Sequence, residues 1–230
     1  MLDPGLYIVS TPIGNLEDIT LRALRVLKEA DFVACEDTRH TGLLLQHFQI
    51  DARFISYHEH NKLQRTPELL EMLRQGRTIA LASDAGTPGI SDPGFFLIRA
   101  AIEKGFPIHP VPGASALLSA LVVSGLPSDH FVFEGFLPKR DGRKLKRLMA
   151  LAGQERTMVF FESPHRVMKT LGQFLEVFGD RRMVLARELT KKFEEAIRGR
   201  ISEVIAVMEK RTLKGEMVLM MGGYERPDEE

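Results

Sequence analysis

The residues with the clearest potential for chemistry form a twelve-residue loop, residues 83–94, with the sequence SDAGTPGISDPG. Its three glycines and two prolines prevent a strand or a helix from continuing through it. The loop follows an apolar run, residues 78–82, that is typical of a strand buried on both faces. We therefore expect it at the carboxyl edge of a sheet, where α/β folds bind ligands and Asp84 can accept hydrogen bonds or face a cation. The alternative is a tight connection in which Asp92 caps the next helix, although a strand–helix joint needs fewer residues.

Two shorter loops are predicted at the same edge. Residues 10–15 (STPIGN) follow the first predicted strand, and residues 111–115 (VPGAS) open a helix after the fifth. Neither loop matches the glycine fingerprint of a dinucleotide site, and the sequence contains no Walker phosphate loop. Together the three loops predict a pocket for a ligand of about nucleoside size.

Charged residues follow the second and third predicted strands. Glu36 and Asp37 are adjacent, and Arg39 is close enough to orient either carboxylate. A surface ion pair combined with a helix cap explains the same residues equally well. After the third strand, His58 and His60 point to opposite faces of an extended chain, and no HExxH spacing occurs. A polar loop or a substrate contact is therefore favoured there, and the sequence predicts no metal site.

Basic residues concentrate in residues 138–147, which hold six cations and one acid. The cations are Lys139, Arg140, Arg143, Lys144, Lys146 and Arg147. The whole chain balances 31 basic against 31 acidic residues, so no global field attracts nucleic acid, and this segment is the candidate for polyphosphate contact. A solvated helix face is the alternative. A second polar group, around Lys191, could line a cleft or form ion pairs at a strand end.

The elements that must position these residues alternate along the chain. Strands are predicted at residues 6–10, 32–35, 53–57, 78–82 and 107–111, and helices between them imply a mostly parallel α/β sheet. One of these helices is predicted to start with Thr66 as its N-cap and Pro67 in its first position. Beyond residue 126, strands at 131–136, 157–162, 183–189, 195–200 and 216–221 suggest a mixed sheet. We therefore predict an N-terminal domain over residues 1–125 and a C-terminal domain over residues 126–230.

Composition excludes several classes of protein. With 44% apolar and 27% charged residues among 230, the chain can form a folded core and is not dominated by disorder. A single cysteine, Cys35, excludes an intrachain disulfide and a multi-cysteine zinc site, and fits a reducing compartment. The start lacks a basic segment for export, and the apolar residues 114–126 are too short to span a membrane, so they predict a buried helix. A cytoplasmic protein with no membrane contact is expected.

At these loops the sequence resembles the tetrapyrrole-methylase-like, class III S-adenosylmethionine-dependent methyltransferases. Along the chain, the motifs that carry the resemblance are STPIGNLEDIT, CEDTRHT, YHEHN, SDAGTPGISDPG, VPGASA, FFESPHR, and KFEE followed by IRG. They cover essentially the whole chain. The resemblance implies two α/β domains of the tetrapyrrole methylase type, with the donor site in the cleft between them, and a homodimer. Relatives usually continue beyond residues 215–224 into a small C-terminal domain that could assist substrate binding.

The resemblance also implies a function and a site. The motifs are most similar to the branch that methylates the ribose 2′-hydroxyl of a cytidine in 16S rRNA of the small ribosomal subunit. Carried over by position, the S-adenosylmethionine site would comprise Pro12, Ile13, Asp84, Gly86, Thr87, Ser115, Ala116, Phe161 and Met217. Methyl transfer depends mainly on alignment of the reacting atoms and requires no metal. Glu36 or Asp37 would take the proton, and Arg39 and Lys191 would hold phosphate or the developing alkoxide.

Two other functions remain open at this point. A C-methyltransferase acting on a corrin or porphyrin precursor would share the fold and the donor pocket, but a macrocycle does not need six cations within residues 138–147. A catalytically silent RNA-binding module would leave the rigid donor loops unexplained.

Overall fold

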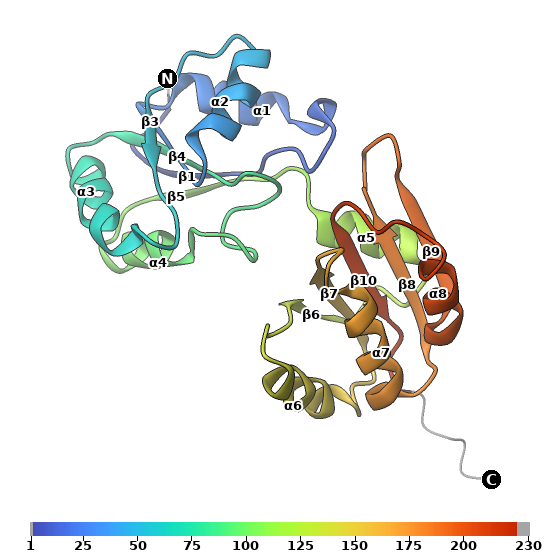
Figure 1. Cartoon of the computed structure of the whole chain (residues 1–230). Helices are drawn as coiled ribbons and strands as arrows, with labels where there is room; N and C mark the ends of the chain where they lie inside the picture. Colours follow the sequence, from blue (N-terminus) through green and yellow to red (C-terminus); the bar gives the residue numbers. More distant parts are fainter. Residues whose placement is uncertain (1, 225–230) are drawn as a thin grey trace. The chain divides into compact units, whose positions relative to one another are not determined.

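The computed structural model describes residues 2–224. The chain divides into two compact units, Met1–Ser115 and Ala116–Glu230. Each unit contains a five-stranded sheet (Figure 1). The division falls at Ser115 and not at the predicted residue 125, because helix α5 (Ala116–Ser124) packs on the second sheet. Arg198 of that sheet also donates a hydrogen bond to the carbonyl oxygen of Ser124, at 3.3 Å.

The sheet of the first unit is entirely parallel, with the strand order β3-β2-β4-β1-β5. Its strands are β1 (Gly5–Val9), β2 (Phe32–Cys35), β3 (Phe54–Ser56), β4 (Thr78–Ala82) and β5 (Ile108–Val111). The central strand β4 is buried at every position, as its apolar sequence predicted. Because all five strands run the same way, the loops that follow them share one edge of the sheet.

Helices cover both faces of this sheet (Figure 1). Helices α1 (Leu21–Glu29) and α2 (Thr38–His47) pack with Val9 and the other side chains of one face. Helices α3 (Lys62–Arg74) and α4 (Phe95–Glu103) pack with the opposite face. A short 3₁₀ helix, η1 (Leu16–Asp18), follows β1. Burial of both faces explains why the strands of this unit read as continuous apolar runs.

The start of α3 corrects one prediction. The helix begins at Lys62, so Thr66 is not its N-cap and Pro67 lies inside it. Thr66 is buried, and its hydroxyl lies 3.2 Å from the hydroxyl of Tyr57. The true start follows a turn closed by Asn61, whose side chain bonds the backbone of His58 and Ser56.

The second sheet is mixed, as predicted, with the strand order β6-β7-β10-β8-β9. Strands β6 (Phe131–Phe136) and β7 (Thr157–Glu162) are parallel. Strands β8 (Arg182–Arg187), β9 (Glu195–Arg200) and β10 (Met217–Met221) complete the sheet through antiparallel pairings.

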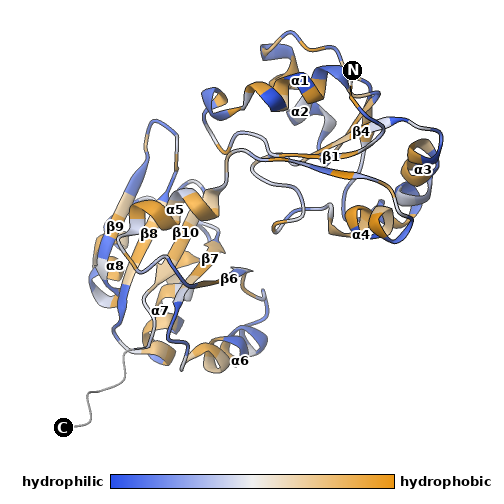
Figure 2. Ribbon diagram, turned by 180° about the vertical axis from the view of Figure 1, so that it is seen from behind, coloured by the Kyte–Doolittle hydropathy of each residue, from blue (hydrophilic) through white to orange (hydrophobic). Residues whose placement is uncertain are grey.

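Helices α6 (Asp141–Leu151), α7 (Val167–Phe178) and α8 (Ile201–Met208) share one core with the second sheet. Helix α5 contacts β8, β9 and β10. It is drawn largely in hydrophobic colours (Figure 2), yet Leu118 and Val122 are 53% and 77% exposed, so the predicted buried helix is buried along one side only. Within residues 2–224, no helix is long and apolar enough to cross a membrane.

Candidate active site

The loops that follow β1 and β4 are joined to each other at the carboxyl edge of the first sheet. Thr11 and Gly86 exchange two backbone hydrogen bonds, of 2.9 and 3.1 Å. The Thr11 hydroxyl donates to the carbonyl oxygen of Ser83 at 2.9 Å, and the hydroxyls of Ser10 and Thr87 lie 2.8 Å apart. These contacts fix Gly86 and Thr87, two predicted donor-site residues, beside the first loop.

The third loop closes on the same place. A Cβ atom at Gly86, whose φ of +82° suits glycine, would lie 3.6 Å from Ile13 Cγ2 and 4.0 Å from the carbonyl oxygen of Ala114. A Cβ atom at Gly113 would lie only 3.0 Å from Ser10 Cβ. The three loops therefore meet, as predicted. Glycine permits the close backbone approach, and Pro12 and Ile13 are buried beside it, which suits an apolar ligand slot edged by backbone polar groups.

A cavity of about 470 Å³ opens beside these loops, after strands β2, β3 and β4. Its lining comprises Glu36, Asp37, Thr38, Arg39, Ser56, His58, Glu59, His60 and Asp84. The structure thus gathers three of the four predicted catalytic residues in one cavity. Asp84 belongs to both regions, because it starts the long loop and its Oδ1 accepts a hydrogen bond from the Asp37 N–H at 3.2 Å.

Asp37 is held by Arg39. Its Oδ1 accepts from Arg39 Nε at 3.1 Å, its Oδ2 accepts from Nη2 at 2.9 Å, and Oδ1 also caps α2 through the Arg39 N–H at 2.9 Å. The side-chain hydrogen bonds from Arg39 hold the pKa of Asp37 well below its usual range. Asp37 is therefore both a carboxylate oriented by Arg39 and the N-cap of α2, so the two explanations of this motif both apply.

Glu36 is in a different state from its neighbour. Partial burial, and then the negative charge of Asp84, raise the pKa of Glu36, while nearby His58 opposes the shift. No hydrogen bond or ion pair reaches the Glu36 carboxylate from residues 2–224. His58 Nδ1 is also buried without a hydrogen-bond partner in that part of the chain. The cavity therefore contains polar groups that its own residues leave unused.

The histidines of this cavity do not form a metal centre with their neighbours. The rings of His58 and His60 lie 6.0 Å apart between centroids. Across the described residues, no group of three or more histidine, cysteine, aspartate or glutamate side chains could hold a metal ion.

The predicted donor-site residues of the second unit lie on opposite faces of its sheet. Met217 is 2% exposed and belongs to the core under α7 and α8, so only its backbone could contact a ligand. Phe161 pairs in register with Val218 and contacts Phe133 and Phe136 edge to face, at 5.0 and 5.6 Å between centroids. Phe161 is thus part of an aromatic cluster that could support a flat ligand.

Lys191, the fourth predicted catalytic residue, belongs to the second unit, in the loop between β8 and β9. Its Nζ lies 3.2 Å from both Glu188 Oε1 and Glu216 Oε2. Burial lowers the pKa of Lys191, but hydrogen bonds and charges from Glu216 and Glu188 outweigh it and raise the pKa. The loop is strained, because Glu188 and Thr190 adopt positive φ of 49° and 66°. The remaining donor-site candidates, Ser115 and Ala116, stand at the division between the units.

The predicted basic segment is only partly available to a phosphate. Its exposed members without an ion pair in the described chain are Lys139, Arg140, Arg143 and Lys146. Arg147 forms a bidentate pair with Glu134, with two contacts of 2.7 Å. Lys144 is 2% exposed and does not belong to the exposed surface, which corrects its place among the phosphate contacts. Its spacing from the buried Leu148 and Leu151 is the sequence signal for this inward position.

Lys144 instead joins a buried polar network that the sequence did not reveal. Its Nζ donates to Thr170 Oγ1 at 3.0 Å, and that hydroxyl donates to Glu162 Oε2 at 2.6 Å. Glu162 also accepts from the Ser163 N–H at 2.9 Å and lies 3.4 Å from Arg166 Nε. A glutamate at the end of an apolar strand, four residues before an arginine, was the available signal.

Arg166 links this network to the basic segment. Its Nη2 donates to the carbonyl oxygen of Leu137 at 2.9 Å, immediately before residues 138–147. The network therefore anchors the turn from which Lys139 and Arg140 project.

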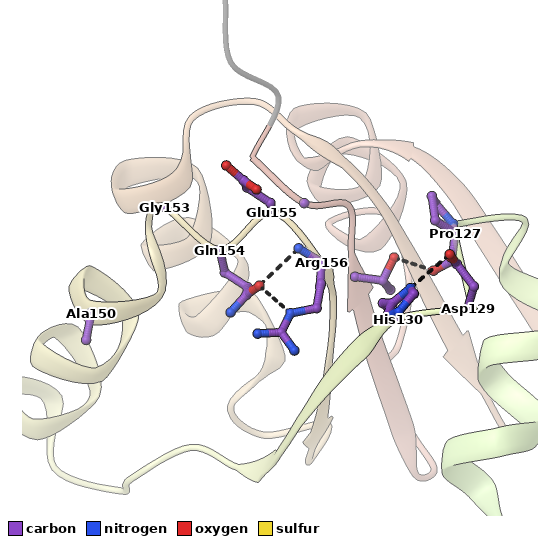
Figure 3. Close-up of a pocket in the computed structure, with 10 residues that line it drawn as sticks. Pro127, Asp129, His130, Ala150, Gly153, Gln154, Glu155 and Arg156 are labelled. Carbon is purple, nitrogen blue, oxygen red and sulfur yellow. Dashed lines mark hydrogen bonds and ion pairs between the residues drawn. The ribbon is translucent and has the colours of Figure 1, made fainter.

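A second cavity, of about 860 Å³, lies beside the first residues of β6 and β7 (Figure 3). Phe161 lies at the opposite end of β7. Gln154 Oε1 accepts from the N–H and the Nε of Arg156, both at 3.1 Å. His130 Nδ1 lies 2.9 Å from Asp129 Oδ2. The interactions drawn there join Gln154 to Arg156, Asp129 to His130 and the Thr157 hydroxyl to the Pro127 carbonyl oxygen. None of the predicted site residues lines this cavity.

Comparisons with known proteins agree on one family. The sequence profile of the family described as Tetrapyrrole (Corrin/Porphyrin) Methylases matches residues 5–205. Among solved structures, the methyltransferase CobJ is similar with a TM-score of 0.70 at 21% identity, over 95% of this chain and 94% of that one. Uroporphyrin-III C-methyltransferase from Thermus thermophilus, complexed with S-adenosylhomocysteine, has a TM-score of 0.66 at 20% identity, over 95% and 97%. At such identities these structures show the fold alone.

Curated relatives are much closer in sequence, and all three described here carry the name ribosomal RNA small subunit methyltransferase I. The protein from Synechocystis sp. is 51% identical over 219 residues, which cover 95% of this chain and 78% of the relative. The protein from Halalkalibacterium halodurans is 49% identical over 218 residues, covering 95% and 75%. The protein from Escherichia coli O157:H7 is 48% identical over 228 residues, covering 98% and 80%.

Proposed function

The chain belongs to the tetrapyrrole (corrin/porphyrin) methylase family, and from its similarity to the curated relatives we propose that it is a ribosomal RNA methyltransferase. It uses S-adenosylmethionine and methylates the ribose 2′-hydroxyl of a cytidine in 16S rRNA of the small subunit. The names of the curated relatives support rRNA methylation. The motifs of residues 35–40 and 83–94 support the choice of acceptor by resemblance.

One observation carries the proposal: two regions suited to two ligands share Asp84 at one sheet edge. The three joined loops after β1, β4 and β5 suit a donor, and the cavity after β2, β3 and β4 suits an acceptor. Neighbouring strands are about 4.8 Å apart, so the ends of β1 and β2 are separated by roughly 10 Å, a span comparable to one nucleoside. Such an edge can hold both reactants of a group transfer.

We assign the donor to the joined loops. Pro12 and Ile13 form the apolar wall, Gly86 and Thr87 bring backbone and hydroxyl groups close, and Asp84 supplies a carboxylate near the positive sulfonium. By resemblance alone, Ser115, Ala116, Phe161 and Met217 are assigned as further donor contacts. When bound, the donor supplies a methyl group on a good leaving group, so no metal is needed for the transfer.

The protein's main contribution is alignment of the 2′-oxygen with the methyl group. The candidate acceptors for the hydroxyl proton are Glu36 and Asp37, and Arg39 keeps Asp37 ionised and oriented. Arg39 and Lys191 are assigned to phosphate or to the developing alkoxide. Outside this edge, Lys139, Arg140, Arg143 and Lys146 are assigned to the RNA backbone.

The test is incubation with isotopically labelled S-adenosylmethionine and either naked 16S rRNA or small ribosomal subunits, followed by mapping of the labelled nucleotide. A label on the ribose of one cytidine is expected. A parallel reaction contains a porphyrin precursor, and label transferred there in preference to RNA would instead favour a tetrapyrrole C-methyltransferase.

Two further parts of the proposal come from the family resemblance. The protein is expected to act as a homodimer in the cytoplasm. Light scattering during size-exclusion chromatography measures the mass directly, and a value near the 25.9 kDa of one chain would contradict the proposed homodimer.

A further inference from the structure

The cavity around Glu36 has more hydrogen-bond acceptors than its own residues use. Arg39 occupies both oxygens of Asp37, and the Asp37 N–H occupies one oxygen of Asp84. The Glu36 carboxylate has no partner within residues 2–224. Glu36 is partly exposed and lines the cavity, so its carboxylate is available to a ligand there that brings hydrogen-bond donors.

Size and position narrow the ligand further. The volume of about 470 Å³ lies in the usual range for small-molecule sites. Glu36 follows β2, which neighbours the β4 strand that leads into the donor loop. A ligand group that suits this place is polar, compact and part of the same molecule as the atom that receives the methyl group. A nucleobase attached to the reacting ribose has these properties.

We propose that this cavity receives the base of the target nucleotide and that Glu36 reads the exocyclic amino group of cytosine. The inference rests on the proposed function and extends it to the choice of base. Glutamate and aspartate accept hydrogen bonds from the cytosine N4 amino group, whereas uracil presents a carbonyl oxygen at that position. Single-stranded RNA can turn its bases outward so that a protein bonds their pairing edge.

His58 completes the reading edge. His58 is partly exposed and lines the same cavity as Glu36. The backbone of His58 is fixed by Asn61, whose Oδ1 accepts from the His58 N–H at 2.8 Å. A ring on a fixed backbone beside a free carboxylate can contact a second edge atom of the same base.

A role for Glu36 as proton acceptor makes a different prediction. Loss of a base slows transfer to any ribose, whichever nucleobase it carries. Loss of a reading residue changes the preference between nucleobases. Under the present inference Glu36 is not the proton acceptor, and alignment of the 2′-oxygen with the methyl group is the main source of the rate.

The experiment compares two RNA substrates, one with the natural target cytidine and one with uridine at that position. Single-turnover methylation at saturating donor is measured for the wild type, Glu36→Gln, Asp37→Asn and Glu59→Gln. The wild type should prefer cytidine by roughly tenfold to a hundredfold, the usual value of one good base contact. Glu36→Gln should lose or reverse this preference, because an amide can donate to the uracil oxygen.

The other variants serve as controls. Glu59→Gln makes the same chemical change in the same cavity, but Glu59 is exposed and pairs with Lys62, so the preference should remain. Asp37→Asn should reduce the methylation rate of both RNA substrates by the same factor. Donor affinity measured by calorimetry should match the wild type in Glu36→Gln, which shows that the fold and donor site are intact.

The outcomes separate the two levels of the argument. A wild type that places no methyl group on the cytidine ribose removes the proposed function. A wild type that does so, with Glu36→Gln keeping the full preference for cytidine, removes only the assignment of Glu36. Glu36→Asp, which retains the charge on a shorter side chain, should keep the direction of the preference, and reversal there would also contradict the assignment.

Discussion

Glu162 and Glu36 occupy similar positions in the two units but have opposite surroundings. Glu162 is the last residue of β7, and Glu36 directly follows β2. The Glu162 side chain is 1% exposed and bonded to Thr170, Ser163 and Arg166. Glu36 lines a cavity and has no such bond within the described residues. A buried carboxylate whose partners are all supplied by the protein maintains the fold, whereas a partly exposed carboxylate that lines a cavity is available to a ligand.

The largest effect expected from this comparison is on folding. Glu162→Ala leaves Lys144 and Arg166 without their buried counter-charge and should lower the free energy of unfolding by about 3 kcal/mol or more. Glu36→Gln, tested in the same urea titration, should change it little. Similar losses for both variants would show that the two glutamates do not differ as described.

The next effect concerns the donor loops, where the first unit relies on close backbone contacts. Thr87→Arg places a long side chain where the Thr87 hydroxyl meets Ser10, and it should weaken S-adenosylmethionine binding roughly tenfold or more by calorimetry. Asp84→Ala should weaken it less, through loss of a carboxylate. Gln75→Arg, at the end of α3, is the matched control. Unchanged affinity in both loop variants would remove the long loop from the donor site.

A smaller effect is expected at the surface that the Glu162 network anchors. Replacing Lys139, Arg140, Arg143 and Lys146 by glutamine should weaken RNA binding and reduce its salt dependence. The slope of log K against log salt should decrease by roughly 0.7 per lost phosphate contact. Arg147→Gln, which removes a cation already paired with Glu134, should change the slope least. An unaltered slope in the fourfold variant would make this segment a solvated helix face.

Much of the fold could be predicted because the strands are short apolar runs with clear boundaries. Strands 32–35, 131–136, 157–162 and 195–200 occur with the predicted bounds. The start of α3 was predicted wrongly because Thr66 followed by Pro67 is a pattern typical of a helix start. In the structure, Thr66 lies within the helix and contacts the Tyr57 hydroxyl instead. The division at Ser115 depends on which sheet α5 covers, and local pattern does not contain that information.

The sequence predicts which loops form the candidate site, but it does not predict the partners of individual side chains there. The three loops converge because β1, β4 and β5 are neighbours in a parallel sheet. Which of two adjacent carboxylates Arg39 binds, and which basic residue of α6 turns inward, depend on side-chain direction and neighbouring elements. A count of charges alone therefore overestimated the basic surface by including Lys144.

The smallest expected effect is on the pH dependence of stability, and it compares the adjacent carboxylates Glu36 and Asp37. Burial and Asp84 raise the pKa of Glu36, so its ionised form is less stable in the folded protein than in the unfolded chain. The destabilisation is absent below the ordinary glutamate pKa, develops as the pH rises through the raised value, and is complete above it. Glu36→Gln should therefore match the wild type near about pH 4 and be slightly more stable near about pH 8, by about 0.5 kcal/mol or less.

Asp37→Asn should behave with the opposite sign. Hydrogen bonds from Arg39 depress the pKa of Asp37, so its ionised form stabilises the folded protein above the ordinary aspartate pKa, and this contribution is lost as the pH falls through the depressed value. The variant should be less stable than the wild type at neutral pH, and the difference should shrink in acid. Urea titrations of both variants at the two pH values give the two signs directly. If the signs agree, the adjacent carboxylates share one environment, and the separation of an oriented Asp37 from a free Glu36 is wrong.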